Sequence, residues 1–162
     1  NIGKYIKIRK LVLRMKDCIF CKIVEGAIPC HKIYEGTGFL AFLDIHPNTK
    51  GMTLVVPKIH FHSDAFDMPK DAYIDLMLIS KKIAKLLEKK LGVKRVAMVM
   101  EGMGIDHIHI KLYPLHGLKD KFVETWADKK VFFKEYEGYI TTLMGEKAND
   151  KELAKLAKKI RE

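Results

Sequence analysis

The segment His107-Ile108-His109-Ile110-Lys111-Leu112-Tyr113 alternates strictly between polar and aliphatic residues up to its closing tyrosine. Successive side chains of a β-strand point to opposite faces, so His107, His109 and Lys111 are predicted to share one face. The three aliphatic residues between them are expected to point into the core, which fixes the register of the strand. Two imidazoles and an ammonium group on one face predict an anion site on a rigid strand.

Further strands are predicted before this segment. Residues 32–34 and 39–45 flank the glycine-rich turn 35–38, which is typical of a hairpin. Residues 52–56 form a continuous apolar run that stops at a proline, as expected of a strand buried on both faces, and residues 95–100 form another central strand.

Between those two strands the apolar residues recur with a helical period, from about Pro69 to Leu91, and Gly92 follows as a stop signal. The face predicted to pack on the sheet consists of Ile74, Met77, Leu78, Ala84, Leu87 and Leu91. The order hairpin, strand, helix, strand, strand predicts an α+β fold: a mostly antiparallel sheet with one long helix packed on it.

The chain is predicted to hold one domain, residues 17–117, between a basic N-terminal extension, residues 1–16, and a C-terminal extension, residues 118–162. Its length of 162 residues and 48% hydrophobic composition suit one core. In the C-terminal extension, residues 131–136 and 139–143 predict a second hairpin, and Asn149-Asp150 predicts the cap of a short helix to Ile160.

Composition restricts the partners and the compartment. No apolar run approaches the roughly 20 residues of a membrane span, so no membrane partner is expected. Three cysteines do not form a closed disulfide framework, which favours a reducing, cytoplasmic location. Six of the ten net positive charges come from residues 1–16, which are either a plain extension or a basic arm that contacts nucleic acid.

A phosphate suits the predicted anion site. Lys111 supplies positive charge, Gly102 and Gly104 allow backbone amides to approach a ligand, and a histidine such as His109 is a competent nucleophile near neutral pH. The alternative is that alternating histidines on an exposed sheet face are merely solvated.

The same segment resembles the signature of the histidine-triad (HIT) family, His-φ-His-φ-His-φ-φ, where φ is apolar. Further matches in the family's order and spacing run from about Asp17 to Gly117, and together they are specific. These matches are Asp17-Cys18-Ile19-Phe20-Cys21-Lys22-Ile23, Ala27-Ile28-Pro29, Phe42-Leu43-Asp44-Ile45, Thr49-Lys50-Gly51 and Val56-Pro57-Lys58-Ile59-His60.

The resemblance implies a HIT-like nucleotidyl hydrolase or transferase that acts on a nucleoside phosphoramidate or a dinucleoside polyphosphate. His109 would attack the α-phosphorus and form a nucleotidyl-histidine, and His107 would orient it. No cofactor is needed for this catalysis. A homodimer is expected, because family members pair their sheets.

The resemblance also implies how the nucleotide is held. Asp44 matches the carboxylate that binds the ribose hydroxyls, and Gly104 is expected beside the phosphates. The walls of the base pocket are matched by Phe20, Ile23, Leu43 and Ile45. The alternatives are that Asp44 only caps the Pro47 turn and that the apolar residues are plain core.

The sequence departs from the family pattern at two positions. Lys111 stands at the third triad position, and Met52 stands where many members have a further histidine. Cys18 and Cys21 resemble a zinc clip that His107 would join, but a thioether at Met52 is a poor fourth ligand. Either a structural zinc is completed by another histidine, with His31, His60 and His62 nearest in sequence, or the two thiols are a reduced pair without metal.

Two other functions stay open from the sequence. One is a binding module that holds a nucleotide without turnover, which the substitutions at Met52 and Lys111 would explain. The other is a basic nucleic-acid adaptor related to the family's DNA-end-processing branch, with residues 1–16 as its arm. Removal of residues 1–14 separates them, because only the adaptor would lose salt-dependent binding.

Overall fold

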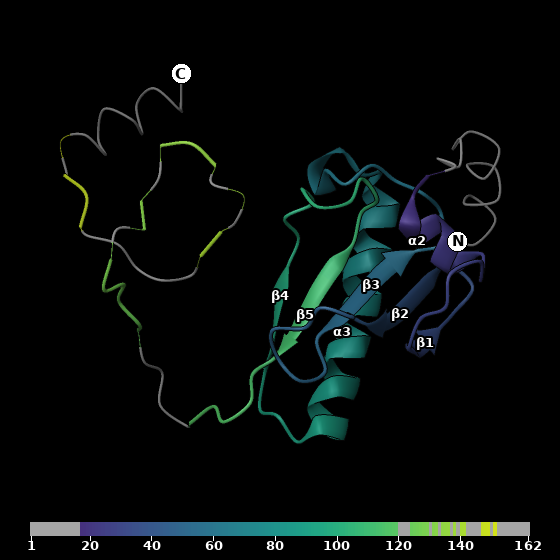
Figure 1. Cartoon of the computed structure of the whole chain (residues 1–162), viewed down its shortest axis with the longest axis horizontal. Helices are drawn as coiled ribbons and strands as arrows, with labels where there is room; N and C mark the ends of the chain where they lie inside the picture. The colour runs from purple at the N-terminus through teal and green to yellow at the C-terminus, as the bar shows by residue number, and fades with distance from the viewer. Residues whose placement is uncertain are drawn as a thin grey trace. The chain divides into compact units, whose positions relative to one another are not determined.

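The computed structural model describes residues 17–119, 124–129, 131–132, 134–136, 138, 140–141, 147–149 and 151. The chain divides into two compact units, Asn1–Leu118 and Lys119–Glu162. All strands and helices named in Figure 1 belong to the first unit.

The first unit is built on an antiparallel five-stranded sheet with the order β1-β2-β3-β5-β4. Its strands are β1 (Lys32–Glu35), β2 (Phe39–Leu43), β3 (Thr53–Pro57), β4 (Val96–Val99) and β5 (Ile110–Pro114). The glycine-rich turn joins β1 to β2, and Gly36 N–H donates to Phe39 O over 2.9 Å. The predicted α+β fold is confirmed.

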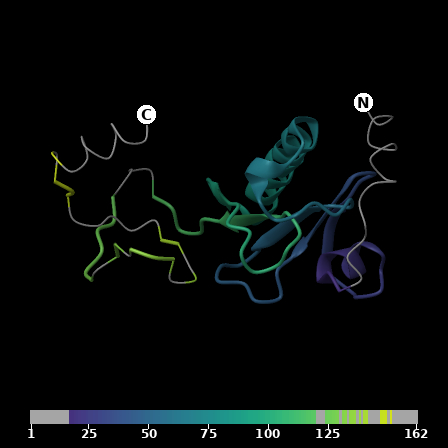
Figure 2. The ribbon, with the colours of Figure 1, turned by 90° about the horizontal axis from the view of Figure 1, so that it is seen from above.

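One face of the sheet is covered by α3 (Lys70–Leu91), which ends at Gly92 in the left-handed conformation, with φ 66° (Figure 2). The core between them consists of Ala41, Val55, Leu76, Ile83, Leu87, Ile108, Ile110 and Leu112. The expectation for the helix face was partly wrong, because Ile74 and Leu78 are 43% and 60% exposed. Each lies two residues from the buried Leu76, and residues two apart point to nearly opposite sides of a helix.

The other face carries a short helix that the sequence patterns did not predict, α2 (Ile19–Val24). It ends before Gly26, which has a φ of 80°. Its apolar side packs on β2 and β3 in a second core cluster, made of Phe20, Ile23, Leu40, Phe42, Leu54 and Val56. This face, opposite α3, also bears the polar residues of β5.

Three predicted strands are longer than the strands observed, including β4, which spans only Val96–Val99 of the predicted residues 95–100. β2 ends at Leu43, so Asp44 and Ile45 lie in the following turn, and β5 begins at Ile110, so His107 and His109 precede the ladder. Ile108 N–H donates to Phe61 O (3.0 Å), in the loop after β3. The alternation continues nevertheless, since Ile108 and Ile110 are fully buried.

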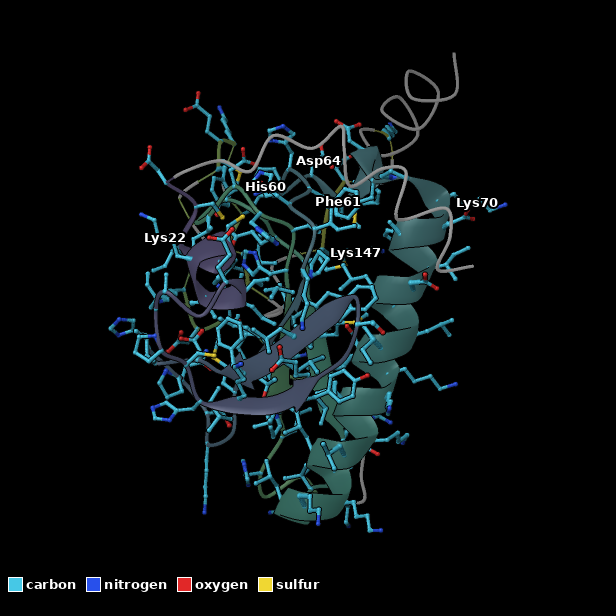
Figure 3. All side chains as sticks on the ribbon, turned by 90° about the vertical axis from the view of Figure 1, so that its right-hand side faces the viewer. Lys22, His60, Phe61, Asp64, Lys70 and Lys147 are labelled. Atoms are coloured by element: carbon cyan, nitrogen blue, oxygen red, sulfur yellow. The ribbon has the colours of Figure 1, made fainter. Side chains whose placement is uncertain are left out.

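That loop returns the chain from β3 to α3 through a short 3₁₀ helix, η1 (Ala65–Asp67). Figure 3 labels His60, Phe61 and Asp64 near one end of the unit, toward the start of α3 at Lys70. The histidines discussed below therefore gather where β3 ends and β5 begins.

The second unit is described only in part. None of its described residues at 131–132, 134–136, 138 and 140–141 is in a strand, so the predicted hairpin is absent there, and its other positions lie outside the described residues. Asn149 Oδ1 accepts from Lys151 N–H (2.9 Å), as a helix cap would; the predicted helix beyond it lies outside the described residues. In the described part of the chain, no helix combines the length and apolar character of a membrane span.

Candidate active site and metal centre

His109 is buried just before the start of the interior strand β5 and held in one orientation. Its side chain is 5% exposed, and its Nδ1–H donates to the carbonyl oxygen of His107 over 2.8 Å. A carbonyl only accepts, so this bond fixes the tautomer and leaves Nε2 with its lone pair. Burial, followed by the charge of Lys111, lowers the pKa of His109. An unprotonated, oriented imidazole is the requirement for a nucleophile, and the alternative of solvated histidines is wrong.

His107 is fixed in the same manner but faces elsewhere. It is fully buried, and its Nε2–H donates to Pro57 O over 3.0 Å. Its Nδ1 lies 3.4 Å from Cys18 Sγ and 3.6 Å from Cys21 Sγ. Burial lowers the pKa of His107 to about 4, so the ring is neutral at pH 7 with a lone pair toward the two sulfurs.

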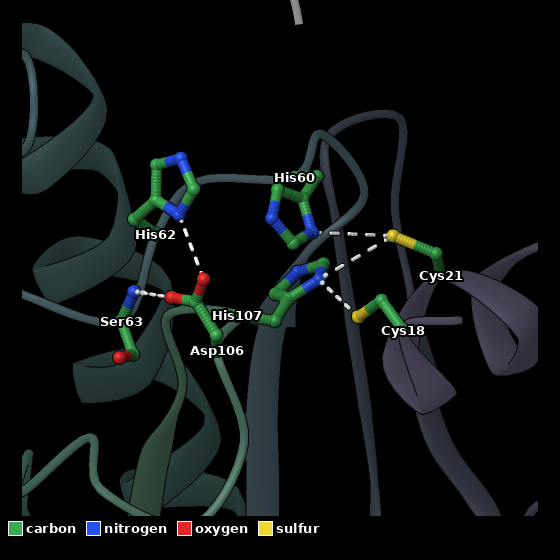
Figure 4. Close-up of polar contacts among 7 residues, drawn as sticks. All are labelled: Cys18, Cys21, His60, His62, Ser63, Asp106 and His107. Atoms are coloured by element: carbon green, nitrogen blue, oxygen red, sulfur yellow. Dashed lines mark hydrogen bonds and ion pairs between the residues drawn. The ribbon is translucent and has the colours of Figure 1, made fainter. Parts of the chain in front are cut away.

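The two thiols and two imidazoles form one cluster, shown in Figure 4. One ligand atom from each of Cys18, Cys21, His60 and His107 lies within 4.8 Å of the others, and His60 Nδ1 is 3.4 Å from Cys21 Sγ. In a tetrahedral zinc site, Zn–S and Zn–N bonds of usual length place sulfur and nitrogen about 3.6 Å apart. The donor set and its spacing therefore fit zinc.

His60 is one of the three histidines that the sequence offers for the fourth position. In the structure His31 is exposed and His62 bonds instead to Asp106. β3 and β5 are antiparallel neighbours, so the residues just after β3 lie beside those just before β5, and His60 meets His107 there.

The Asp106–His62 pair lies beside this cluster. Asp106 Oδ2 accepts from His62 Nδ1 at 2.8 Å, and its Oδ1 accepts from Ser63 N–H at 2.9 Å. The bond from His62 and then that from Ser63 lower the pKa of Asp106. Sequence reasoning did not single out Asp106, although it directly precedes His107.

The residues matched to a base pocket divide into two groups. Phe20 and Ile23 are 3% and 7% exposed and belong to the second core cluster, and the Phe20 ring lies edge-on to His109 with centroids 5.1 Å apart. Leu43 is half-buried, whereas Ile45 is 73% exposed. Phe20 is therefore both core and a neighbour of His109.

Asp44 is in the turn after β2, and its Oδ1 accepts from His46 N–H over 2.8 Å. One oxygen of this carboxylate therefore caps the turn, as the alternative interpretation of Asp44 expected. The negative charges of Asp44 and Glu101 act against the lowering of the pKa of His109 by burial. Glu101 was not among the expected site residues.

The two glycines expected near a phosphate differ. Gly102 has a φ of 79°, and a Cβ there would lie 2.5 Å from Ser63 O, so this glycine serves a close backbone contact. Gly104 is exposed, and a Cβ there would meet nothing within 4 Å. Only Gly104 keeps open space beside its backbone.

The fold, with a buried, oriented histidine beside a Cys2His2 cluster, defines an α+β protein of the histidine-triad class. The HIT domain family model matches residues 25–117, and the chain belongs to this family. It is 34% identical to the adenosine 5′-monophosphoramidase HNT1 of Saccharomyces cerevisiae over 119 residues, which cover 72% of this chain and 73% of that protein.

Solved structures agree with this assignment. The chain matches SMU.412c from Streptococcus mutans UA159 with 33% identity and a TM-score of 0.66, over 91% of this chain and 85% of the other. It matches a Zn-bound histidine triad family protein from Mycobacterium smegmatis with 33% identity and a TM-score of 0.59, over 65% of this chain and 81% of the other.

Proposed function

We propose that the protein hydrolyses nucleoside phosphoramidates or dinucleoside polyphosphates at the α-phosphate, through a nucleotidyl-histidine at His109. One observation carries the proposal: the hydrogen bond from His109 Nδ1 to His107 O, which leaves the Nε2 lone pair for attack on phosphorus. The adenosine 5′-monophosphoramidase of yeast supports the substrate class.

The reaction has two balanced steps. His109 Nε2 forms a bond to the α-phosphorus while the bond from phosphorus to the leaving nitrogen or oxygen breaks, and the leaving group takes up a proton. Water then forms a bond to the same phosphorus while the bond from phosphorus to Nε2 breaks. The water gives up one proton, which balances the proton taken by the leaving group, and the nucleoside monophosphate and free His109 result. Another acceptor in place of water would make the reaction a transfer.

Three side chains have proposed roles around this phosphorus. Lys111, two residues after His109, offsets charge that develops on the phosphoryl oxygens. Asp44 binds the ribose hydroxyls through Oδ2, since Oδ1 is used by the turn. The backbone of Gly104 approaches the phosphates, while Phe20, Ile23, Leu43 and Ile45 contact the base.

The test follows nucleoside monophosphate release from adenosine 5′-phosphoramidate and, separately, from a diadenosine polyphosphate. Wild-type protein is expected to release the monophosphate, and His109→Ala is expected to lose this activity. An α-phosphorus label should remain on wild-type protein after denaturation and be absent from His109→Ala. Nucleotide binding without release by wild-type protein would contradict the enzyme and favour a binding module.

We propose in addition that Cys18, Cys21, His60 and His107 hold a structural zinc. The zinc-bound relative and the tetrahedral spacing of the donors support this assignment. Zinc supplies no reaction step here. It fixes the ring of His107, and the backbone carbonyl of the same residue orients His109. Cys18→Ser is expected to lose bound zinc, whereas Cys30→Ser should keep one zinc per chain. Removal of zinc from the wild-type protein by a chelator is expected to lower the midpoint of thermal unfolding. Equal zinc content in the two variants would contradict the site.

A homodimer remains a prediction that the sheet order makes testable. β4 is at one edge of the five-stranded sheet, and its Met98 is 45% exposed. We propose that this edge pairs with a second copy, because exposed strand edges are otherwise prone to uncontrolled association. Sedimentation equilibrium is expected to give a dimer for the wild type and a monomer for Met98→Lys; a monomeric wild type would contradict the pairing.

A further inference from the structure

Asp106 joins the two segments that carry the imidazoles of the proposed metal centre. Its carboxylate accepts from Ser63 N–H at 2.9 Å and from His62 Nδ1 at 2.8 Å (Figure 4). Ile108 N–H donates to Phe61 O over 3.0 Å on the same pair of segments. The loop that holds His60 is therefore tied to the segment that holds His107 on both sides of that histidine, at Asp106 and at Ile108.

The ring of His60 lies between the four-donor cluster and Asp106. It is 4% exposed, its Nδ1 faces Cys21 Sγ at 3.4 Å, and its Nε2 is buried without a hydrogen-bond partner. Ligand atoms of His60, His62 and Asp106 lie within 4.8 Å of one another, and Figure 4 shows the second nitrogen of His60 on the side of His62. A buried N–H without an acceptor is costly, so this nitrogen calls for an acceptor on that side.

Asp106 is the acceptor within reach. A carboxylate has two oxygens with about four lone-pair positions, and the two bonds described above use only two of them. Asp106 is 53% exposed at its side chain, so a rotation of the carboxylate or one bridging water can complete a bond to His60 Nε2. Metal-binding histidines commonly donate their second ring N–H to a carboxylate in this way.

A second cation held by His60, His62 and Asp106 is the competing explanation of the same three residues. It would require His60 to give up its remaining ring proton while Nδ1 faces the first centre. It would also break the bond between His62 and Asp106, which already satisfies both groups. A hydrogen bond to Asp106 requires neither change, so the geometry favours it.

We propose that Asp106 is a positioning residue of the metal centre, which accepts the Nε2–H of His60 and holds the two imidazole-bearing segments at ligand distance. The proposal rests on metal binding by Cys18, Cys21, His60 and His107, but it does not depend on which nucleotide is hydrolysed. It assigns Asp106 a role through His60, without contact to the nucleotide.

The test measures Co²⁺ binding to the full chain by chelator competition and by visible absorption. In Asp106→Asn the amide oxygen can still accept from Ser63 N–H, which turns the NH₂ group toward the imidazoles. The bond to Ser63 N–H is thus kept, but the carboxylate oxygen that accepts from His62 and is proposed to accept from His60 is lost. We expect about 10- to 100-fold weaker Co²⁺ binding and a shifted d–d spectrum. Asp67→Asn, an exposed acid of η1, is the matched control and should bind as the wild type does.

A second readout separates positioning from mere stability. The metal-free forms of Asp106→Asn and wild type should unfold at the same temperature, and His62→Ala, which removes one anchor of the carboxylate, should weaken Co²⁺ binding less than Asp106→Asn. A lower midpoint of thermal unfolding for metal-free Asp106→Asn, with unchanged Co²⁺ affinity, would overturn the proposal and give Asp106 a role in stability alone.

The remaining outcomes are also distinct. Equal Co²⁺ affinity in wild type and Asp106→Asn would overturn the role of Asp106 and leave the four-ligand centre intact. No Co²⁺ binding by the wild type would overturn both. Two Co²⁺ ions per chain, with the second lost in Asp106→Asn but kept in Cys18→Ser, would overturn the proposal in favour of a separate cation site.

Discussion

Replacement of Asp44 by asparagine tests how the proposed site recognises ribose. Asp44 Oδ1 accepts from His46 N–H in the turn after β2, and an asparagine oxygen can keep that bond. The position of Oδ2 would be taken by an NH₂ group, which donates and cannot accept from the ribose hydroxyls. The substitution thus removes the proposed ribose acceptor while the turn is retained.

The magnitude follows from the single oxygen that the turn leaves available. Hydrogen bonds to charged groups contribute about 1.5–3 kcal/mol, and Asp44 is half-buried, so the lower part of that range, about 1.5–2 kcal/mol, applies. At 1.4 kcal/mol for each factor of ten, KM for a ribonucleotide substrate should rise about 10- to 30-fold. The kcat should not fall, because the charge of Asp44 raises the pKa of His109, and its removal favours the unprotonated nucleophile.

The assay compares a ribonucleoside phosphoramidate with its 2′,3′-dideoxy analogue for both proteins. Wild-type protein should prefer the ribonucleoside, and Asp44→Asn should lose most of that preference, so that the two changes are not additive. Asp64→Asn is a matched control, because Asp64 Oδ1 accepts from Phe66 N–H at 2.9 Å in a similar turn. An Asp44→Asn protein that retains the full preference for the ribonucleoside would refute the role of Asp44.

Two further substitutions test the charge near the nucleophile and the core beneath it. Burial first and Lys111 second lower the pKa of His109, so Lys111→Met should raise this pKa and move the acidic limb of the kcat/KM profile to higher pH. It should also lower kcat roughly 100-fold, because the stabilisation of charge on the phosphoryl oxygens is lost. An acidic limb at the same pH as in the wild type would show that the charge of Lys111 does not affect the imidazole. Ile110→Ala, at a fully buried position, should lower the free energy of unfolding by about 2–5 kcal/mol in urea titrations. Leu78→Ala, at a 60% exposed position, should change it by less than about 0.5 kcal/mol, and similar losses in the two would contradict the observed core.

Local periodicity predicted the central strand because the alternation allows only one assignment of its residues to the two faces of the sheet. Ile108, Ile110 and Leu112 are 0%, 0% and 1% exposed, as the alternation required. The strand could nevertheless not be bounded from its own residues. β5 starts at Ile110 because the ladder with β3 ends there, and a ladder depends on two segments.

The helix shows where periodicity alone was insufficient. α3 has apolar residues on more than one side, so Ile74 and Leu78 fitted a helical stripe as well as Leu76 and Ile83 did. The sheet decided which stripe is buried, since only one can face Val55 and Ile110. An apolar pattern predicts that a helix packs, but its partner selects the face.

The sequence by itself determined the fold class and the family motifs, which contain three of the four metal-type donors, because each motif lies within a short stretch of the chain. Only the tertiary structure identified His60 as the fourth donor, gave His109 its tautomer and placed Asp106 beside His60. The contacts of the four-donor cluster and of Asp106 join segments about 40 to 90 residues apart, whose meeting depends on the antiparallel pairing of β3 with β5 and on the packing of α2. The tautomer of His109 is set by a carbonyl only two residues away, but that bond depends on the backbone conformation just before β5. A contact between distant segments leaves no periodic signal in either of them, so it becomes visible only when the chain is folded.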